Sequence, residues 1–229
     1  MNQIAQQLLD VIDRLPPQVR LLAVSKTFDA ASVQVAWQAG QRAFGENYVQ
    51  EAVAKMGALA AIRGDIEWHL IGPLQSNKTA VVAEHFDWVQ TIDRLKIAQR
   101  LNDQRPTHLP RLNVCIQVNV DGGQTKSGVD CTTSLQALLD MAREVSALPR
   151  LALRGLLAIP EPENDRAKQQ AVFAKVRVAF DFLNSNLSAD QQLDTLSMGM
   201  SADFEAAIAA GSTMVRVGSA IFGARQYAA

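Results

Sequence analysis

Lys26 is the residue of this sequence whose position most directly suggests chemistry. It follows the apolar run 21–24 (LLAV) and one serine. Apolar runs of this length are typical of a strand buried on both faces, as in a parallel sheet, and Lys26 would lie at its C-terminal end. A lysine held partly out of water can lose its proton and attack a carbonyl to form a Schiff base. A solvated lysine just past a strand is the more common arrangement, so the other strand ends decide how Lys26 is interpreted.

Ser201, Gly218 and Ser219 could bind a phosphate group near the end of the chain. Ser201 precedes a helical pattern at 203–210 and could cap it, while Gly218 offers a backbone N–H with little steric obstruction. Barrels of alternating strands and helices often bind phosphate with the loops after strands 7 and 8. A plain helix cap at Ser201 and a packing contact at Gly218 fit the spacing equally well. The sequence has no lysine-bearing P-loop motif, so any phosphate site here is of the barrel type.

Arg216 precedes Gly218 by two residues and therefore shares its face of the last strand. An arginine directed into a packed barrel needs a partner. Pyridoxal 5′-phosphate (PLP) would bring an aldehyde to Lys26, a phosphate to Ser201 and Gly218, and a ring acceptor to Arg216. Class I aldolase chemistry also uses a barrel lysine and a phosphate pocket, but it leaves Arg216 unexplained.

Eight short apolar strands alternate with helical patterns along the chain, and a further helix is expected at 4–12 before the first of them. Strict alternation predicts a parallel sheet with right-handed crossovers, and eight such units can close on themselves. We therefore expect an α/β fold, a single (β/α)8 TIM-type barrel with an extra N-terminal helix. A doubly wound open sheet is the alternative, but no G-x-G-x-x-G follows the first strand. The strands are expected at 21–26, 42–47, 66–72, 88–93, 113–120, 153–159, 196–200 and 214–218.

Length and composition favour one soluble domain spanning 1–229, because a barrel of about 250 residues is usually a single domain. The formal net charge of −1 does not indicate binding to nucleic acid or to an anionic membrane, which would favour an excess of positive charge. Cys115 and Cys131 lack metal-ligand spacing, which predicts no metal site and a reduced, cytoplasmic chain. The N-terminus does not look like a signal peptide, and no apolar run reaches the ~18 residues of a membrane span.

The chain contains the motifs AVSK, FGENYVQE, WHLIGPLQSNK, TIDR, KSG and LSMGMSADFEAAIAAGSTMVRVGSAIFGAR. These motifs resemble those of the pyridoxal phosphate homeostasis protein family. The resemblance runs from about residue 21 to residue 225, nearly the whole chain, and the last motif is highly specific.

The resemblance implies a barrel like the N-terminal domain of alanine racemase, with PLP held by a lysine as an internal aldimine. Lys26 matches that lysine, and Arg216 matches the arginine that faces the pyridine nitrogen. Asn47 matches a position beside the ring. Many members carry a second lysine two residues after the first, where this chain has Phe28. The residues that match the family's phosphate-binding segments are Ser201, Gly218 and Ser219.

The residues favour a PLP-binding protein that stores or delivers its cofactor without catalysing a reaction of its own, and the resemblance implies that it acts in vitamin B6 homeostasis. Amino-acid inversion needs a proton-transfer group on each face of the substrate carbon, and racemases of this fold bring the second one from an additional C-terminal domain. The chain ends soon after the eighth strand, so we expect no such domain. The alternative is a small PLP-dependent racemase or isomerase whose second acid is Tyr48, His69 or Lys126.

Other polar residues are expected to have structural roles. His69 is expected to be a hydrogen-bonded residue within the barrel, Asp93 and Arg94 a polar pair at a strand end, and Lys78 a solvated lysine. PLP-dependent apoenzymes are possible recipients of the cofactor, and a monomer is expected.

Overall fold

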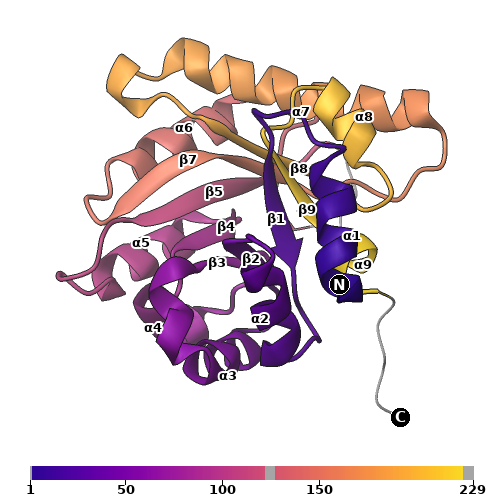
Figure 1. Cartoon of the computed structure of the whole chain (residues 1–229). Coiled ribbons are helices and arrows are strands. Elements are labelled where there is room, and N and C mark those ends of the chain that lie inside the picture. The colour runs from indigo at the N-terminus through magenta and orange to yellow at the C-terminus, as the bar shows by residue number, and fades with distance from the viewer. Residues whose placement is uncertain (1, 122–126, 224–229) are drawn as a thin grey trace.

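The protein is a closed barrel of parallel strands surrounded by helices (Figure 1), and the computed structural model describes residues 2–121 and 127–223. Within this described part, eight strands pair in the order β4-β3-β2-β1-β9-β8-β7-β5, and β5 pairs with β4 to close the ring. The strands are β1 (Arg20–Val24), β2 (Ala43–Glu46), β3 (Glu67–Leu70), β4 (Trp88–Ile92), β5 (Leu112–Asn119), β7 (Leu151–Ala158), β8 (Thr195–Met200) and β9 (Met214–Val217).

The first and last strands of the barrel lie side by side and hold the two ends of the chain together. β1 and β9 pair in parallel, with Arg20 opposite Met214 and Ala23 opposite Val217. A short extra strand, β6 (Val129–Asp130), pairs with β5 outside the ring. The barrel therefore has no open edge between β1 and β9, and its strand ends converge at two opposite mouths.

Helices cover the outside of the barrel and connect successive strands (Figure 1). The first helix, α1 (Gln3–Ile12), precedes the barrel and packs against α2 and α9. The others are α2 (Ala30–Gln38), α3 (Val49–Ala58), α4 (Thr79–His85), α5 (Leu95–Gln104), α6 (Gln136–Ser146), α7 (Arg166–Asn186), α8 (Phe204–Ala209) and α9 (Ser219–Phe222), with 3-10 turns at Ala60–Asp65, Ser76–Lys78 and Ala189–Gln191. None of the described helices is long and apolar enough to cross a lipid bilayer.

The predicted (β/α)8 barrel and its extra N-terminal helix are confirmed. One detail differs from the expectation: β6 is not among the expected strands, because two residues carry no periodicity. Lys126, one of the candidate second acids, lies outside the described residues.

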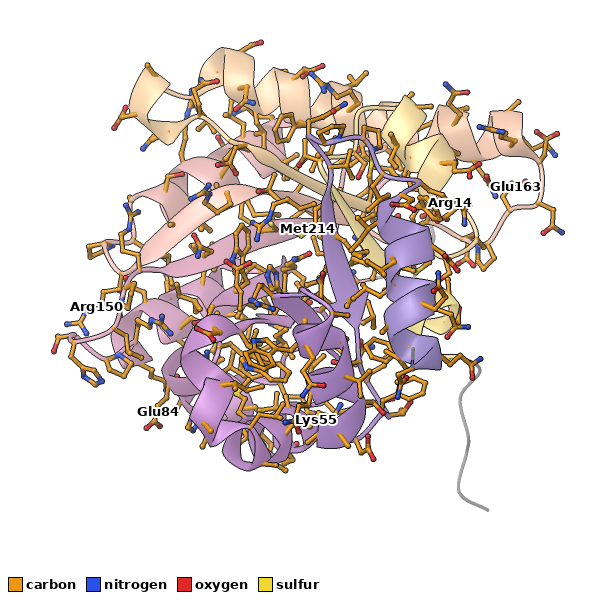
Figure 2. The ribbon with its side chains drawn as sticks, viewed as in Figure 1. Arg14, Lys55, Glu84, Arg150, Glu163 and Met214 are labelled. Atoms are coloured by element: carbon orange, nitrogen blue, oxygen red, sulfur yellow. The ribbon has the colours of Figure 1, made fainter. Side chains whose placement is uncertain are left out.

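Residues of one strand alternate between the barrel interior and the layer under the helices. On β9, Met214 belongs to a small apolar cluster inside the barrel, whereas Val215 and Val217 belong to the large core under the helices. Figure 2 labels Met214 among the strands at the centre of the molecule. Because strand side chains alternate with a period of two, Arg216 points inward with Met214. The interior also contains buried polar residues, namely His69, Gln90 and Ser197.

Candidate functional site

A cavity of about 450 Å³ lies at the C-terminal ends of the barrel strands. This is the end at which barrels place their ligand-binding groups, since loops from several strands meet there. All the residues that the sequence predicts for cofactor binding line this one cavity, namely Lys26, Asn47, Ser201, Arg216, Gly218 and Ser219. Its apolar walls come from Val24, Phe28, Ile71, Ile159 and Met200, of which the sequence analysis singled out Phe28 alone.

Lys26 lies two residues past the end of β1, partly buried, in a segment whose backbone is constrained. The next residue, Thr27, has a φ of 68°, a left-handed conformation that a β-branched residue rarely adopts. Such strain costs on the order of 1–3 kcal/mol and persists only where the surroundings enforce it. Here the Thr27 N–H donates to Glu51 Oε1 at 2.6 Å. The turn that carries Lys26 is therefore held from α3.

A buried cluster, which we call the Lys55 clamp, holds the residues on both sides of Lys26. Lys55 Nζ on α3 donates to the Ser25 carbonyl at 2.6 Å and contacts Glu46 Oε1 and Glu51 Oε1, each at 2.7 Å. Ser25 Oγ also donates to Glu46 Oε1 at 2.6 Å. Burial raises the pKa of Glu46, and the adjacent Lys55 charge opposes that effect. The clamp consists of Ser25, Glu46, Glu51 and Lys55, and Figure 2 labels Lys55 on its helix.

Lys26 and Lys55 therefore differ in their hydrogen-bond partners and in their access to the cavity. An ammonium group has three N–H donors, and those of Lys55 meet three oxygens in a site where the side chain is 6% exposed. Lys55 is thus a fixed structural cation. Lys26 lines the cavity, which a ligand aldehyde could enter. Sequence reasoning missed the clamp, because its members look like ordinary polar residues of a strand end and a helix.

Arg216 is buried inside the barrel and reaches the cavity from β9. Its Nη1 donates to Ser197 Oγ and its Nη2 to the Ala158 carbonyl, both at 2.9 Å. Burial lowers the pKa of the guanidinium to about 10, so it remains charged at neutral pH. Two neutral oxygens thus supply the partner that an inward arginine needs, and Arg216 also lines the cavity.

Ser201, Gly218 and Ser219 lie together at the side of the cavity formed after β8 and β9. The expectation that Ser201 caps the following helix is wrong: α8 begins after Asp203, whose Oδ1 accepts from the Met200 N–H at 2.6 Å. Ser201 lies in the turn before that cap. A side chain on Gly218 would press on the β1 backbone, since its Cβ would lie 3.2 Å from the Val24 carbonyl oxygen.

Asn47 presents an unsatisfied acceptor at the cavity wall. Its Oδ1 is buried and has no hydrogen-bond partner among the described residues. Buried polar atoms are nearly always paired, so an orphan in a cavity wall points to a missing donor. The residues present therefore fit a ligand that has an aldehyde, a ring acceptor, a phosphate and a hydrogen-bond donor.

The other polar residues considered from sequence lie outside the cavity lining. His69 is fully buried in the barrel and hydrogen-bonded, as expected, and Asp93 pairs with Arg94 at 2.8 Å. Lys78 is partly exposed in a 3-10 turn. Tyr48 is 57% exposed. Within residues 2–121 and 127–223, none of these five residues lines the cavity.

Comparisons with known proteins agree with this geometry. The family described as "Alanine racemase, N-terminal domain" matches residues 1–226. The pyridoxal phosphate homeostasis proteins of Escherichia coli (strain K12) and Pseudomonas aeruginosa are 52% and 53% identical to this chain, with alignments that cover 99% or more of each chain.

Two solved structures share the fold over most of the chain. PipY of Synechococcus elongatus, solved with PLP bound, is 40% identical, with a TM-score of 0.87 over 96% of this chain and 100% of its own. An alanine racemase of Clostridium difficile has a TM-score of 0.78 over 99% of this chain and 57% of its own, but at 14% identity it shows the fold alone.

Proposed function

This chain belongs to the pyridoxal phosphate homeostasis protein family, and we propose that it binds PLP in the cavity at the C-terminal ends of its barrel strands. One observation carries this proposal: a single cavity is lined by Lys26, by Arg216 and by the two expected phosphate-binding residues Ser201 and Gly218. PLP bound to PipY, which is 40% identical to this chain, supports it. When bound, PLP supplies an aldehyde that reacts reversibly with amines.

Each polar residue of the cavity has a distinct role in this proposal. Lys26 binds the aldehyde from the tip of the clamped turn. Arg216 faces the pyridine nitrogen, and because it keeps its proton it leaves that nitrogen unprotonated. Asn47 Oδ1 accepts a hydrogen bond beside the ring. The phosphate binds between the Ser201 turn and the start of α9, where Gly218 and Ser219 carry N–H groups that have no partner within the helix. Phe28, in the place of a second lysine, packs on Phe222 with ring centroids 5.2 Å apart.

We further propose that the protein holds and delivers PLP and does not catalyse a reaction of its own. The names of its relatives support this role. Arg216 leaves the ring a weaker electron sink, which disfavours carbanion chemistry. Of the second acids that a racemase would need, His69 is enclosed in the barrel and Tyr48 lies outside the cavity lining. Lys126 lies outside the described residues.

The test of PLP binding is a visible absorption spectrum of the purified protein, followed by borohydride reduction and peptide mapping. We expect a visible band and covalent PLP on the peptide that contains Lys26. A protein without a visible band, or with PLP trapped mainly on Lys78 or Lys126, contradicts the proposal.

The test of the non-catalytic role is incubation of the PLP-loaded protein with L-alanine in deuterated water. We expect no inversion of the α-carbon, together with reactivation of a PLP-dependent apoenzyme. Inversion at a turnover near the roughly 10 per second typical of enzymes would establish the racemase alternative. A single domain over 1–229, a monomeric state, a cytoplasmic location and transfer to apoenzymes remain predictions that belong to this proposal.

A further inference from the structure

A line of polar side chains crosses the barrel interior and ends at Arg216. His69 Nε2 lies 2.7 Å from Glu67 Oε1, and His69 Nδ1 lies 2.8 Å from Gln90 Nε2. Gln90 Oε1 accepts from Ser197 Oγ at 2.7 Å, and Ser197 Oγ accepts from Arg216 Nη1 at 2.9 Å. His69, Gln90 and Ser197 are fully buried, and Arg216 is 3% exposed. We call these residues the barrel chain.

The direction of every hydrogen bond in the barrel chain follows from its two ends. A guanidinium only donates, so Ser197 Oγ accepts from Arg216 and must give its own proton to Gln90 Oε1. The amide nitrogen of Gln90 likewise only donates, so His69 Nδ1 must be unprotonated. The His69 proton is therefore on Nε2, where it points at the Glu67 carboxylate. All the links donate in one direction, from Arg216 towards Glu67.

The charges along the barrel chain agree with this direction. Burial lowers the pKa of His69, which keeps its ring neutral at pH 7. Glu67 also accepts from Arg20 Nη2 at 2.7 Å, and the donors around it hold the pKa of its carboxyl below the usual range despite its partial burial. A cation at one end and a carboxylate at the other polarise the neutral groups between them, which strengthens each bond.

The barrel chain also explains why Ser197 can anchor Arg216. A serine hydroxyl rotates and can donate or accept. Because Gln90 takes the Ser197 proton, the oxygen stays turned to the arginine as an acceptor. Ser197 and Ala158 then accept from Nη1 and Nη2 of the Arg216 guanidinium, respectively, and these two hydrogen bonds restrict its rotation.

We propose that Ser197, Gln90 and His69 are positioning residues that hold the Arg216 guanidinium in a fixed orientation towards the cavity, and so towards the pyridine nitrogen of PLP. The part of this role that concerns PLP rests on the proposed function. The hydrogen bonds of the barrel chain are a property of the protein without cofactor, so their direction can be measured separately.

The first experiment compares two serine variants of the PLP-loaded protein. Ser197→Ala removes the anchor of Arg216, whereas Ser212→Ala removes a buried hydroxyl whose partners among the described residues are the carbonyls of Leu196, Met198 and Met214. We expect Ser197→Ala to weaken PLP binding about tenfold and to shift the visible band, because it removes a hydrogen bond to a charged group. Ser212→Ala should leave both unchanged, and Ser197→Thr, which keeps the hydroxyl, should restore them. Equal effects of the two alanine variants would overturn the proposal.

The second experiment uses ¹⁵N NMR of the protein without PLP, in which the histidines are His69, His85 and His108. We expect His69 in one neutral form with its proton on Nε2, assigned by its absence in His69→Gln. Gln90→Glu should add a proton on Nδ1, because the ring would then lie between two carboxylates. A wild-type His69 protonated on Nδ1 would overturn the barrel chain.

The two experiments distinguish a failure of the proposed function from a failure of the positioning role. A wild-type protein without a visible band overturns the proposed function and the role of the barrel chain towards PLP, while the NMR result still decides whether the hydrogen bonds at His69 run in the inferred direction. A normal band with the expected NMR result, but no difference between the serine variants, overturns the positioning role alone.

Discussion

Two cavities of similar size lie at opposite ends of the barrel, and only one has the chemistry of a ligand site. The upper cavity, at the C-terminal strand ends, has a volume of about 450 Å³, and the lower cavity, at the N-terminal ends, about 420 Å³. The lower one is lined by arginines from the starts of strands and from loops, which are Arg20, Arg42, Arg63, Arg105 and Arg111. The upper one has apolar walls with a few convergent polar groups.

The arginines of the lower cavity already bind the protein itself. Arg105 donates to the carbonyls of Ala83, Phe86 and Pro110, and Arg63 pairs with Asp87. These guanidiniums tie together loops whose carbonyls would otherwise lack partners. The upper cavity instead retains an orphan acceptor and a positioned guanidinium. Volume alone therefore does not identify a site; unused hydrogen-bonding capacity against an apolar wall does.

The largest expected difference between the upper and lower cavities is the effect of a single substitution on PLP binding. Lys26→Ala, in the upper cavity, should abolish the visible band, because no other lysine lines this cavity in the described part of the chain. Arg42→Ala, in the lower cavity, should leave the band and the affinity unchanged. Absorbance titration with PLP measures both. A band that survives in Lys26→Ala, or disappears in Arg42→Ala, would reverse the assignment of the two ends.

The second difference is in stability. Lys55→Met should lower the free energy of unfolding by about 3–5 kcal/mol, because it leaves Glu46 buried without its cation. Arg20→Met at the lower end removes a half-exposed pair with Glu67 and should cost about 1 kcal/mol or less. Urea unfolding of the protein without PLP measures both values. Similar costs for the two variants would mean that the clamp is no more important than a surface pair.

The third prediction tests the phosphate side of the upper cavity. Gly218→Val should displace the start of α9 from β1 and weaken PLP about tenfold to a hundredfold, the range expected for lost hydrogen bonds to a charged group. Pyridoxal, which lacks the phosphate, should lose much less affinity. Competition binding with both ligands makes the comparison, and an equal loss for both would indicate a general distortion of the barrel mouth.

The smallest expected effect concerns the interior between the two cavities. His69 stays neutral when folded, because burial lowers its pKa, but takes up a proton when unfolded below its ordinary pKa of about 6.5. The unfolded state then binds more protons, so the free energy of unfolding should fall by about 1.4 kcal/mol per pH unit as the pH drops below about 6.5. Urea unfolding between pH 7 and 5 should show this slope reduced in His69→Gln. Parallel pH profiles for the two proteins would exclude a buried neutral His69.

The sequence by itself determined the barrel and the set of residues at its upper mouth. Strand and helix patterns are local, and eight alternating units have few ways to bury their apolar faces, so the architecture follows from periodicity. Closure of the ring then brings Lys26, Ser201 and Gly218 together although they are far apart in the chain. The same residues pointed to PLP, and the resemblance to a known family added the role of Asn47.

Only the tertiary structure decided which partners these residues have. Ser197 and Gln90 are 107 residues apart, and Lys55 meets Ser25 across 30 residues, so no local pattern contains either contact. The same holds for the error at Ser201: both residue types are good caps, but Asp203 occupies the N-cap position of α8, and its carboxylate accepts from the Met200 N–H instead of from the helix. Residue type states what a side chain can donate or accept, but its partner depends on the register and closure of strands from distant parts of the chain. That is why the Lys55 clamp and the barrel chain could be found only in the folded molecule.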